Sequence, residues 1–171
     1  MTTRKTAKLT GGACAVSAII AIVLSMDTGL RINQAGLELI GNAESCRRDP
    51  YMCPARVLTV GIGSTGKVQN RRYADEEIAE MWVTDIRAAE TCANQYANGQ
   101  RMNDNQFSAI TSFTFNVGCG ALQKSTLARY AKREQWSQVC GELAKWVYIG
   151  KEKSSGLVTR RAKEMALCTK S

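Results

Sequence analysis

The sequence predicts an α+β protein in which a small β-hairpin sheet precedes a mainly helical body, with one apolar helix at the N-terminus. Residues 57–65 are rich in β-branched residues and punctuated by glycine, which is typical of a hairpin. From residue 74 onward, apolar residues recur at helical spacing and no proline interrupts them. The 171 residues suffice for one well-buried domain and are too few for two ordinary ones. We expect a cleft where the sheet meets the helices.

The N-terminal element is an uncharged run of 18 residues, Leu9 to Met26, preceded by Arg4, Lys5 and Lys8 and closed by Asp27. Such a run is just long enough to span a bilayer as a helix, and the upstream basic residues place the N-terminus in the cytoplasm. Nine of the 18 residues are Gly, Ala, Ser or Thr. The segment therefore gains much less from lipid than a leucine-rich span does.

Several export signals are compatible with this segment. A cleaved signal peptide needs small residues before its cleavage site, and the run ends Val23-Leu-Ser-Met26 without a convincing one. A lipoprotein signal needs leucine three residues before its cysteine, but Gly11 stands there before Cys14. A permanent anchor remains open, and a marginal anchor that later leaves the membrane fits the composition better. We predict an anchor segment at 1–27, spanning at 9–26, and a folded domain at 28–171.

The remaining elements follow from periodicity and end signals. Three acidic residues at 75–77 favour the start of a helix, Asp104 is a good N-cap, and Gly118 is a good helix terminator. We expect helices at 34–43, 74–95, 104–117, 125–130, 135–147 and 157–168, and a hairpin within 57–65 whose turns use Gly61, Gly63 and Gly66. The aromatic and methionine stripes on these helices are interpreted as core rather than as ligand platforms.

Composition excludes several kinds of chemistry. The chain has no histidine, which rules out a Ser-His-Asp triad, a Cys-His pair and the usual His-ligated zinc site. It has no CxxC pair, so we do not expect a zinc ribbon or a thioredoxin-type site. We also expect no metal and no cofactor. The net charge of +8 favours an anionic partner such as nucleic acid, a membrane surface or a cell wall. The basic residues are scattered and no nucleic-acid motif is present, so we expect no nucleic-acid partner.

Seven cysteines indicate an oxidising compartment if at least one disulfide forms, and the odd number leaves one thiol unpaired in a monomer. Cys46 and Cys53 are close enough in sequence to close a small disulfide loop, and Cys14 lies inside the apolar segment. The other four are Cys92, Cys119, Cys140 and Cys168. Four thiols allow three pairings, and free buried thiols are equally acceptable.

A carboxylic acid, a thiol and a hydroxyl follow one another at Glu44, Cys53 and Thr59, just before the glycine-flanked segment. Their spacing resembles the active-site pattern of the phage-type lysozymes (glycoside hydrolase family 24), in which Glu is followed after eight residues by Asp or Cys, and after five more by Thr. The segments 61–66, 104–118, 125–127 and 156–164 also resemble that family. The resemblance covers about residues 35 to 168.

The resemblance implies a lysozyme-like fold and a muramidase that hydrolyses the β-1,4 bond between N-acetylmuramic acid and N-acetylglucosamine in peptidoglycan for host lysis. It implies that Glu44 is the general acid, that Cys53 stands where the family usually has a carboxylate, and that Thr59 positions water. A thiolate serves as base or nucleophile only in a favourable environment, which Arg47, Arg48 or Arg56 would supply. Whether the reaction inverts or retains the sugar configuration stays open.

The segment around Cys46 and Cys53, together with Cys14, is similar to the signal-anchor-release endolysins with a catalytic cysteine. That resemblance implies an enzyme tethered in the host inner membrane with its catalytic domain in the periplasm, inactive through a Cys46–Cys53 disulfide. On release into the periplasm, Cys14 would attack that bridge, form Cys14–Cys46 and free Cys53. Lipid would sequester Cys14 until then and disfavour its thiolate. We expect a monomer whose partners are the glycan strand and, transiently, the membrane.

Three alternatives remain at this point. The chain would be a non-catalytic, membrane-tethered wall-binding protein that kept a lysozyme fold, or a permanently anchored hydrolase that is always active. Alternatively, Cys46–Cys53 would be a purely structural disulfide, and Thr59 an ordinary strand residue, since threonine favours strands.

Overall fold

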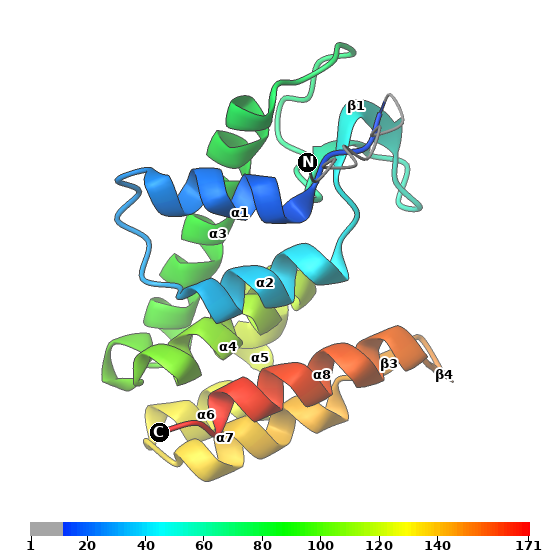
Figure 1. The fold of residues 1–171 in the computed structure, drawn as a ribbon. Coiled ribbons are helices and arrows are strands. Elements are labelled where there is room, and N and C mark those ends of the chain that lie inside the picture. Colours follow the sequence, from blue (N-terminus) through cyan, green and yellow to red (C-terminus); the bar gives the residue numbers. More distant parts are fainter. Residues whose placement is uncertain (1–11) are drawn as a thin grey trace, which may run out of the picture.

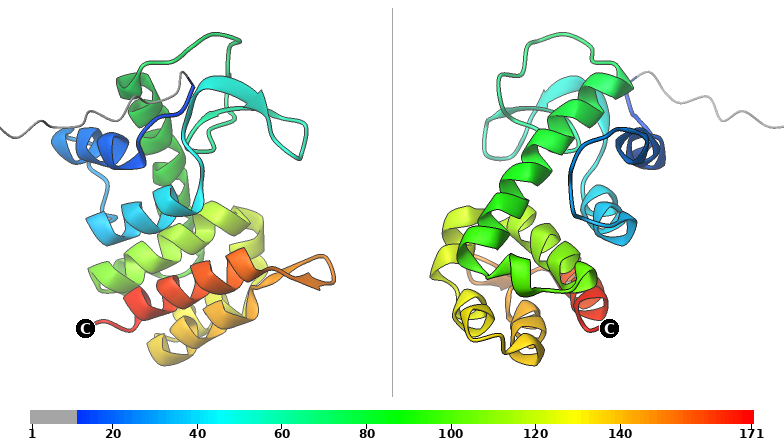
Figure 2. Two further views of the ribbon diagram at one scale, coloured as in Figure 1. Left: turned by 45° about the vertical axis from the view of Figure 1, so that its right-hand side comes forward. Right: turned by 90° about the vertical axis from the view of Figure 1, so that its left-hand side faces the viewer.

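Two separate clusters of buried side chains hold the chain together, one at each end of the long helix α3 (Asp75–Tyr96). The N-terminal cluster includes Ile19, Ile40 and Trp82, and the C-terminal cluster includes Phe107 and Phe113. The structure is a computed structural model that describes residues 12–171. Figures 1 and 2 show α3 running from the region of the hairpin down to the helices of the C-terminal cluster.

The elements follow one another as α1 (Val16–Ser25), α2 (Gln34–Ala43), β1 (Arg47–Met52), β2 (Leu58–Gly61), α3, the 3-10 helix η1 (Gly99–Arg101), α4 (Asp104–Val117), α5 (Cys119–Lys124), α6 (Thr126–Lys132), α7 (Trp136–Glu142), the 3-10 helix η2 (Leu143–Lys145), β3 (Tyr148–Ile149), β4 (Glu152–Lys153) and α8 (Ser155–Cys168). The fold is mostly helical with small antiparallel hairpins, as the α+β prediction requires. Strand β1 pairs with β2, and β3 pairs with β4.

The long helices lie where their apolar spacing predicts them, and their ends follow local capping chemistry. Asn33 caps α2 by accepting the Gly36 N–H, and Asn103, one residue before the predicted cap, accepts the Gln106 N–H at the start of α4. The predicted helix at 135–147 was too long: α7 ends at Glu142, and a 3-10 turn and Trp146 follow. Helix α5 and the hairpin β3–β4 were not predicted, because segments this short carry almost no periodic signal.

The predicted hairpin within 57–65 was wrong in its pairing. Residues Leu58–Gly61 form only its second strand, and the first is Arg47–Met52. Strand β1 is polar and contains Pro50, which a strand with no fully buried residue tolerates. Gly61 and Gly63 do make a tight turn, with φ of 63° and 82°, but this turn follows β2 and folds Ser64 back onto Val60.

Helix α1 forms most of the described part of the predicted membrane segment, and it packs against α2 and α3 (Figure 1). Ile19, Ile20 and Val23 are buried in the N-terminal cluster. The opposite face consists mainly of small residues, and its exposed members are Ser17, Ala18, Ala21, Leu24 and Ser25. Among residues 12–171, no helix is both long and apolar enough to cross a membrane. Residues 1–11, which include the start of the predicted span, lie outside the described part.

Close approach of α1 to α2 depends on Gly41. A Cβ atom at Gly41 would lie 2.5 Å from Val16 Cγ1 of α1 and 3.5 Å from the Trp82 ring of α3. No side chain fits in that space without moving its neighbours. Gly41 therefore permits the packing of α1 against the body of the protein.

Candidate active site

Glu44 lies at the C-terminal end of α2, where the helical body meets the hairpin. Its side chain is 32% exposed, and one carboxylate oxygen accepts a hydrogen bond from Arg160 Nη1 at 3.1 Å. The other oxygen faces Gly63, where an added Cβ would lie 3.9 Å away. Glu44 is thus held from the helical side while it faces the turn after β2.

Cys53 follows β1 and begins the turn that leads to β2. Its N–H donates to the Val57 carbonyl at 3.0 Å, and its carbonyl accepts from the Arg56 N–H at 2.8 Å. Arg56 has a φ of 58°, in the left-handed region that a tight turn of this kind requires. The turn leaves the Cys53 side chain half-buried and free, whereas the other six cysteines are in disulfides.

Thr59 and Cys53 are joined directly. The Thr59 hydroxyl is on a buried residue of β2, and it has one proton for two acceptors, the Val57 carbonyl at 2.9 Å and the Cys53 sulfur. Hydrogen bonds from the Val57 N–H and then from the Thr59 hydroxyl lower the pKa of the Cys53 thiol. The hairpin therefore favours a thiolate at Cys53.

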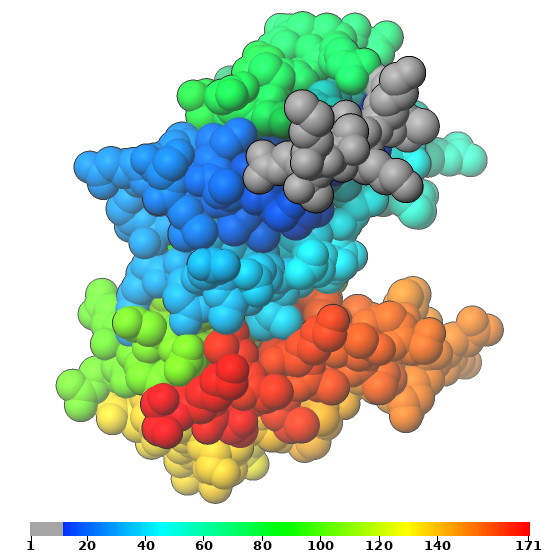
Figure 3. All heavy atoms as spheres, viewed as in Figure 1, coloured from blue at the N-terminus to red at the C-terminus, as the bar shows by residue number. Residues whose placement is uncertain are grey.

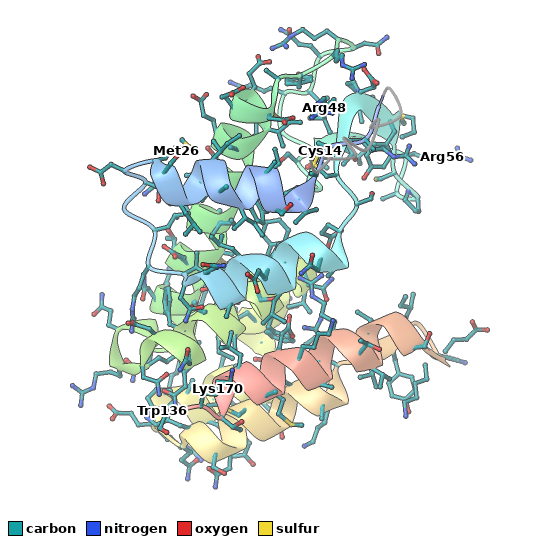
Figure 4. All side chains as sticks on the ribbon, in the orientation of Figure 1. Cys14, Met26, Arg48, Arg56, Trp136 and Lys170 are labelled. Carbon is teal, nitrogen blue, oxygen red and sulfur yellow. A yellow bond between two sulfur atoms is a disulfide. The ribbon has the colours of Figure 1, made fainter. Side chains whose placement is uncertain are left out.

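The expectation that arginines would favour this thiolate was wrong. Arg47 stacks on the ring of Tyr51 at 4.6 Å, and Arg48 is paired with Asp75. Arg56 is exposed and points away from the body in Figure 4. The pKa of Cys53 is lowered by hydrogen bonds within the turn and not by nearby positive charge. The sequence did not indicate this, because composition does not reveal the geometry of a turn.

Arg160 was missed as a site residue, and it connects Glu44 to the core of the C-terminal part. It is buried on α8, where Nε contacts Glu164 at 3.2 Å and Nη2 donates to the Ser112 carbonyl at 3.2 Å. Its remaining contact is the one to Glu44. The available signal was the pair of arginines followed by a glutamate at helical spacing in residues 160–164. Nothing in that segment indicates that Arg160 contacts a residue 116 positions away in the sequence.

Glu164 is fully buried and satisfied on every side. It accepts from the Ser112 hydroxyl at 2.7 Å, from Arg160, and from Arg161 Nη1. Arg161 in turn donates to Asn116 and to the Trp146 carbonyl, and its guanidinium lies 4.9 Å from the centre of the Phe113 ring. Burial lowers the pKa of Arg161, and the nearby Glu164 carboxylate opposes that shift. The two arginines are balanced by the two carboxylates of Glu164 and Glu44.

A groove of about 940 Å³ runs between α2 and α8 and includes Glu44 in its wall. Figure 3 shows the hollow between these two helices. Arg160, Lys163 and Lys170 contribute positive charge, and Glu38 contributes a second carboxylate. Cys53 and Thr59 do not line this groove. The structure thus joins Cys53 to Thr59 on the hairpin and places Glu44 against the same hairpin at Gly63, at the end of a separate groove.

Each of the six paired cysteines has a defined partner: Cys14–Cys46, Cys92–Cys119 and Cys140–Cys168. The last two bonds choose one of the three pairings that sequence alone allowed. The first bond joins the segment before α1 to the residue before β1, with Cα atoms 5.1 Å apart. Within residues 12–171, no group of three Cys, Asp or Glu side chains is arranged to hold a metal ion.

Comparison with known proteins agrees with this arrangement. The family model described as phage lysozyme matches residues 41–164. The SAR-endolysin of Escherichia phage P1 is 44% identical over 96% of this chain and 95% of its own length. The crystal structure of the active form of the P1 phage endolysin Lyz matches with a TM-score of 0.87 at 43% identity, covering 93% of this chain and 96% of that one.

A crystal structure of the same P1 protein in another state provides a contrast. The secreted inactive form of Lyz matches with a TM-score of only 0.56 at 44% identity, covering 80% of this chain and 94% of that one. Sequence identity is almost equal in the two comparisons, so the structure described above is closer in conformation to the active form of Lyz than to its inactive form.

Proposed function

The chain belongs to the phage lysozyme family and is a lysozyme-type glycoside hydrolase of the endolysin kind, and we propose that Glu44, Cys53 and Thr59 carry out its reaction. The bond cleaved is the β-1,4 link between N-acetylmuramic acid and N-acetylglucosamine in peptidoglycan. The observation that carries this assignment is the hydrogen-bonded Cys53–Thr59 pair on a hairpin whose turn faces Glu44.

Each residue has a separate task in the reaction. Glu44 donates a proton to the leaving glycosidic oxygen, which the exposed part of its carboxyl can reach from the groove. Cys53 acts as a thiolate on the other side, either on water or on the sugar. Thr59 supports that thiolate through its hydroxyl, and the same hydroxyl can orient water when its proton turns away from sulfur. Arg160 positions Glu44 without reaching the reacting atoms.

A redox switch controls this site. In the structure, Cys14–Cys46 leaves Cys53 free. The alternative bond, Cys46–Cys53, conflicts with the hairpin. The pairs Arg47–Gly61 and Met52–Leu58 hold the ends of β1 apart by three residue steps of β2, about 10 Å. Cys46 and Cys53 lie beyond these ends, whereas a disulfide needs Cα atoms within about 7 Å. Forming Cys46–Cys53 therefore dismantles the hairpin that carries Thr59.

The anchor segment serves two environments in turn. Before release, residues 9–26 span the host inner membrane with the N-terminus in the cytoplasm, while residues 28–171 fold in the periplasm. After release, α1 buries Ile19, Ile20 and Val23 in the N-terminal cluster and presents mainly small residues to water. The same small residues weaken its attraction to lipid, so one composition supports both states. The released enzyme acts as a periplasmic monomer on the glycan strand.

The Glu44→Gln substitution tests the catalytic assignment. Removing the general acid is expected to lower the rate of peptidoglycan solubilisation at least about 100-fold. Binding to insoluble peptidoglycan is expected to persist, because glutamine keeps the shape of the side chain. Glu80→Gln, on an exposed position of α3, is the matched control with the same charge change. Full lytic activity of Glu44→Gln would overturn the assignment and favour a wall-binding protein.

A further inference from the structure

The segment before α1 lies along the edge of the hairpin sheet and makes one β-bridge to it, so we call residues 12–14 the added strand. Ala13 pairs with Arg47 in an antiparallel bridge. On either side of this pair, the Cys14 N–H donates to the Cys46 carbonyl at 3.1 Å, and the Arg48 N–H donates to the Gly12 carbonyl at 2.8 Å. This is the geometry by which an extended peptide joins an exposed strand edge. Here the joining peptide is the chain's own N-terminal segment.

Arg48 holds this added strand with its side chain as well as its backbone. Its Nη1 donates to the Ala13 carbonyl at 2.6 Å, while Nε and Nη2 form a two-bond contact with the Asp75 carboxylate at 2.8 and 2.9 Å. The Arg48 carbonyl accepts from the Tyr73 N–H at 2.9 Å. Arg48 thus ties the added strand to the first turn of α3, and Figure 4 shows it beside Cys14.

Both members of the Arg48–Asp75 pair are well placed to keep their geometry. Their side chains are only 20% and 23% exposed, and the contact with Asp75 raises the pKa of Arg48. Asp75 is fixed at the N-terminus of a helix of 22 residues. Space is tight at the entry to the strand, since a Cβ on Gly12 would lie 3.0 Å from Asp49 Oδ2. The position of Gly12 therefore leaves little room for a side chain.

We propose that Arg48 and Asp75 form a clamp that seats Gly12–Cys14 against β1 and so directs the attack of Cys14 onto Cys46. This inference rests on the proposed switch. It adds the residues that direct the attack of Cys14 to the sulfur of Cys46 rather than to that of Cys53. They are positioning residues for the exchange and take no part in glycan cleavage.

The choice of sulfur decides whether the exchange activates the enzyme. The Cys14 thiolate attacks Sγ of Cys46, the Cys14–Cys46 bond forms, the Cys46–Cys53 bond breaks, and Cys53 leaves with the electron pair as a thiolate. No oxidant or reductant is consumed. Attack on Cys53 instead would form Cys14–Cys53 and leave the catalytic thiol blocked. The bridge between Ala13 and Arg47 and the hydrogen bond from the Cys14 N–H to the Cys46 carbonyl place Cys14 directly beside Cys46.

The exchange itself is the measurement that tests this clamp. Full-length protein is purified from membranes in detergent with Cys46–Cys53 oxidised, and is then released by dilution of the detergent. Samples are quenched in acid, free thiols are alkylated, and the disulfides are mapped by mass spectrometry over time. Arg48→Gln is expected to slow formation of Cys14–Cys46 by about tenfold, the effect of one lost charge-assisted hydrogen bond. A fraction of Cys14–Cys53 is expected to appear.

Two further variants separate the clamp from charge alone. Arg48→Lys keeps the charge but cannot contact Asp75 and Ala13 with one rigid fork, so it is expected to stay slow. Arg101→Gln removes the same charge from an exposed ion pair with Glu134 and is expected to exchange at the wild-type rate.

A separate background checks that the clamp variants still fold and work. In a Cys14→Ser/Cys46→Ser protein, no intramolecular partner can block Cys53 from these positions. There, Arg48→Gln is expected to keep peptidoglycan hydrolysis within about twofold of the background, since it touches no reacting group. A large loss in this background would make Arg48 a structural or catalytic residue and overturn the clamp.

The remaining outcomes distinguish the clamp from the switch. If wild-type protein exchanges and Arg48→Gln exchanges equally fast to the same bond, the clamp is wrong and the switch stands. If released wild-type protein keeps Cys46–Cys53, the switch is wrong and the clamp falls with it. Slow exchange with misdirected bonds in both Arg48 variants, and normal exchange in Arg101→Gln, supports the clamp.

Discussion

The two sides of the proposed active site are built in different ways. Glu44 is held by Arg160, which belongs to a buried ionic cluster with Arg161 and Glu164. The cluster packs against the ring of Phe113. Two disulfides, Cys92–Cys119 and Cys140–Cys168, stabilise the same helical region. Cys53 instead depends on a short, polar hairpin and on the disulfide that holds the N-terminal segment.

Under the proposed switch, this difference makes the Glu44 side the permanent half of the site and the Cys53 side the conditional half. Among residues 12–171, the ionic cluster contains no group from α1 or from the segment before it, so the contact between Glu44 and Arg160 does not use that part of the chain. The hairpin is attached to α3 by the Ser64–Asp85 hydrogen bond of 2.5 Å and by close packing of Gly61 on Ile78. Strand β1 of this hairpin has no fully buried residue. A strand with so little buried surface can be lost and rebuilt at a small cost in stability.

A variant whose conditional half is always active tests the proposed division most severely. Cys53→Asp places at this position the carboxylate that the family pattern allows and that no disulfide can trap. Lysis by Cys53→Asp is expected to be unaffected by Cys14→Ser, whereas Cys14→Ser alone is expected to lower activity at least about 100-fold. Peptidoglycan hydrolysis by the released single and double variants measures this. Equal dependence on Cys14 in both backgrounds would contradict the division.

The permanent half should be the more costly to damage. Glu164→Gln leaves Arg161 and Arg160 short of a buried counter-charge and is expected to lower the free energy of unfolding by about 3–5 kcal/mol. Urea denaturation of the purified protein reports the change. Glu134→Gln, which breaks the exposed pair with Arg101, is the control and should have a much smaller effect. Similar losses in the two variants would show that the buried cluster is not special.

The docking of α1 should respond to a single methyl group. Gly41→Ala is expected to lower the free energy of unfolding of the released form by about 1–3 kcal/mol, because the added Cβ overlaps Val16. The membrane-bound form has no such contact if α1 is in the bilayer, so the fraction released should fall. Fractionation of membranes and periplasm measures that fraction. Gly156→Ala, whose Cβ meets nothing closer than 3.7 Å, is the control.

Loss of the hydrogen bond from Thr59 to Cys53 should cause only a shift in the pH dependence of kcat/KM. Activity that requires the Cys53 thiolate rises with pH through the pKa of that thiol, and the hydrogen bonds from Val57 and Thr59 lower this pKa. Thr59→Val removes one of them, so the rising limb of kcat/KM should move to higher pH. An unchanged limb would indicate that a group other than Cys53 sets it. The comparison needs the Cys14–Cys46 form of both proteins.

Sequence predicted the permanent framework better than the conditional parts. Helices α2 and α3 were recognisable because each buries one face, and burial of one face leaves a periodic pattern. Helix α4 is buried on all sides over residues 107–114, and its end signals, rather than an amphipathic pattern, marked it. Strand β1 was missed because it has no buried face, and its Pro50 favours a loop. The link from Glu44 to Arg160 was missed for another reason, since ion pairs between distant segments leave no local pattern.

The amino-acid sequence shows which chemical groups are available: Glu44, Cys53 and Thr59 at a spacing typical of one family, an odd number of cysteines, and an apolar segment in which half of the residues are small. The tertiary structure sets which of these groups contact one another. It chose the three disulfides, placed Arg160 on Glu44, and set Gly12–Cys14 beside β1 under Arg48. The reason is physical. Local preferences are encoded within a few residues, whereas these contacts join segments that only folding brings together.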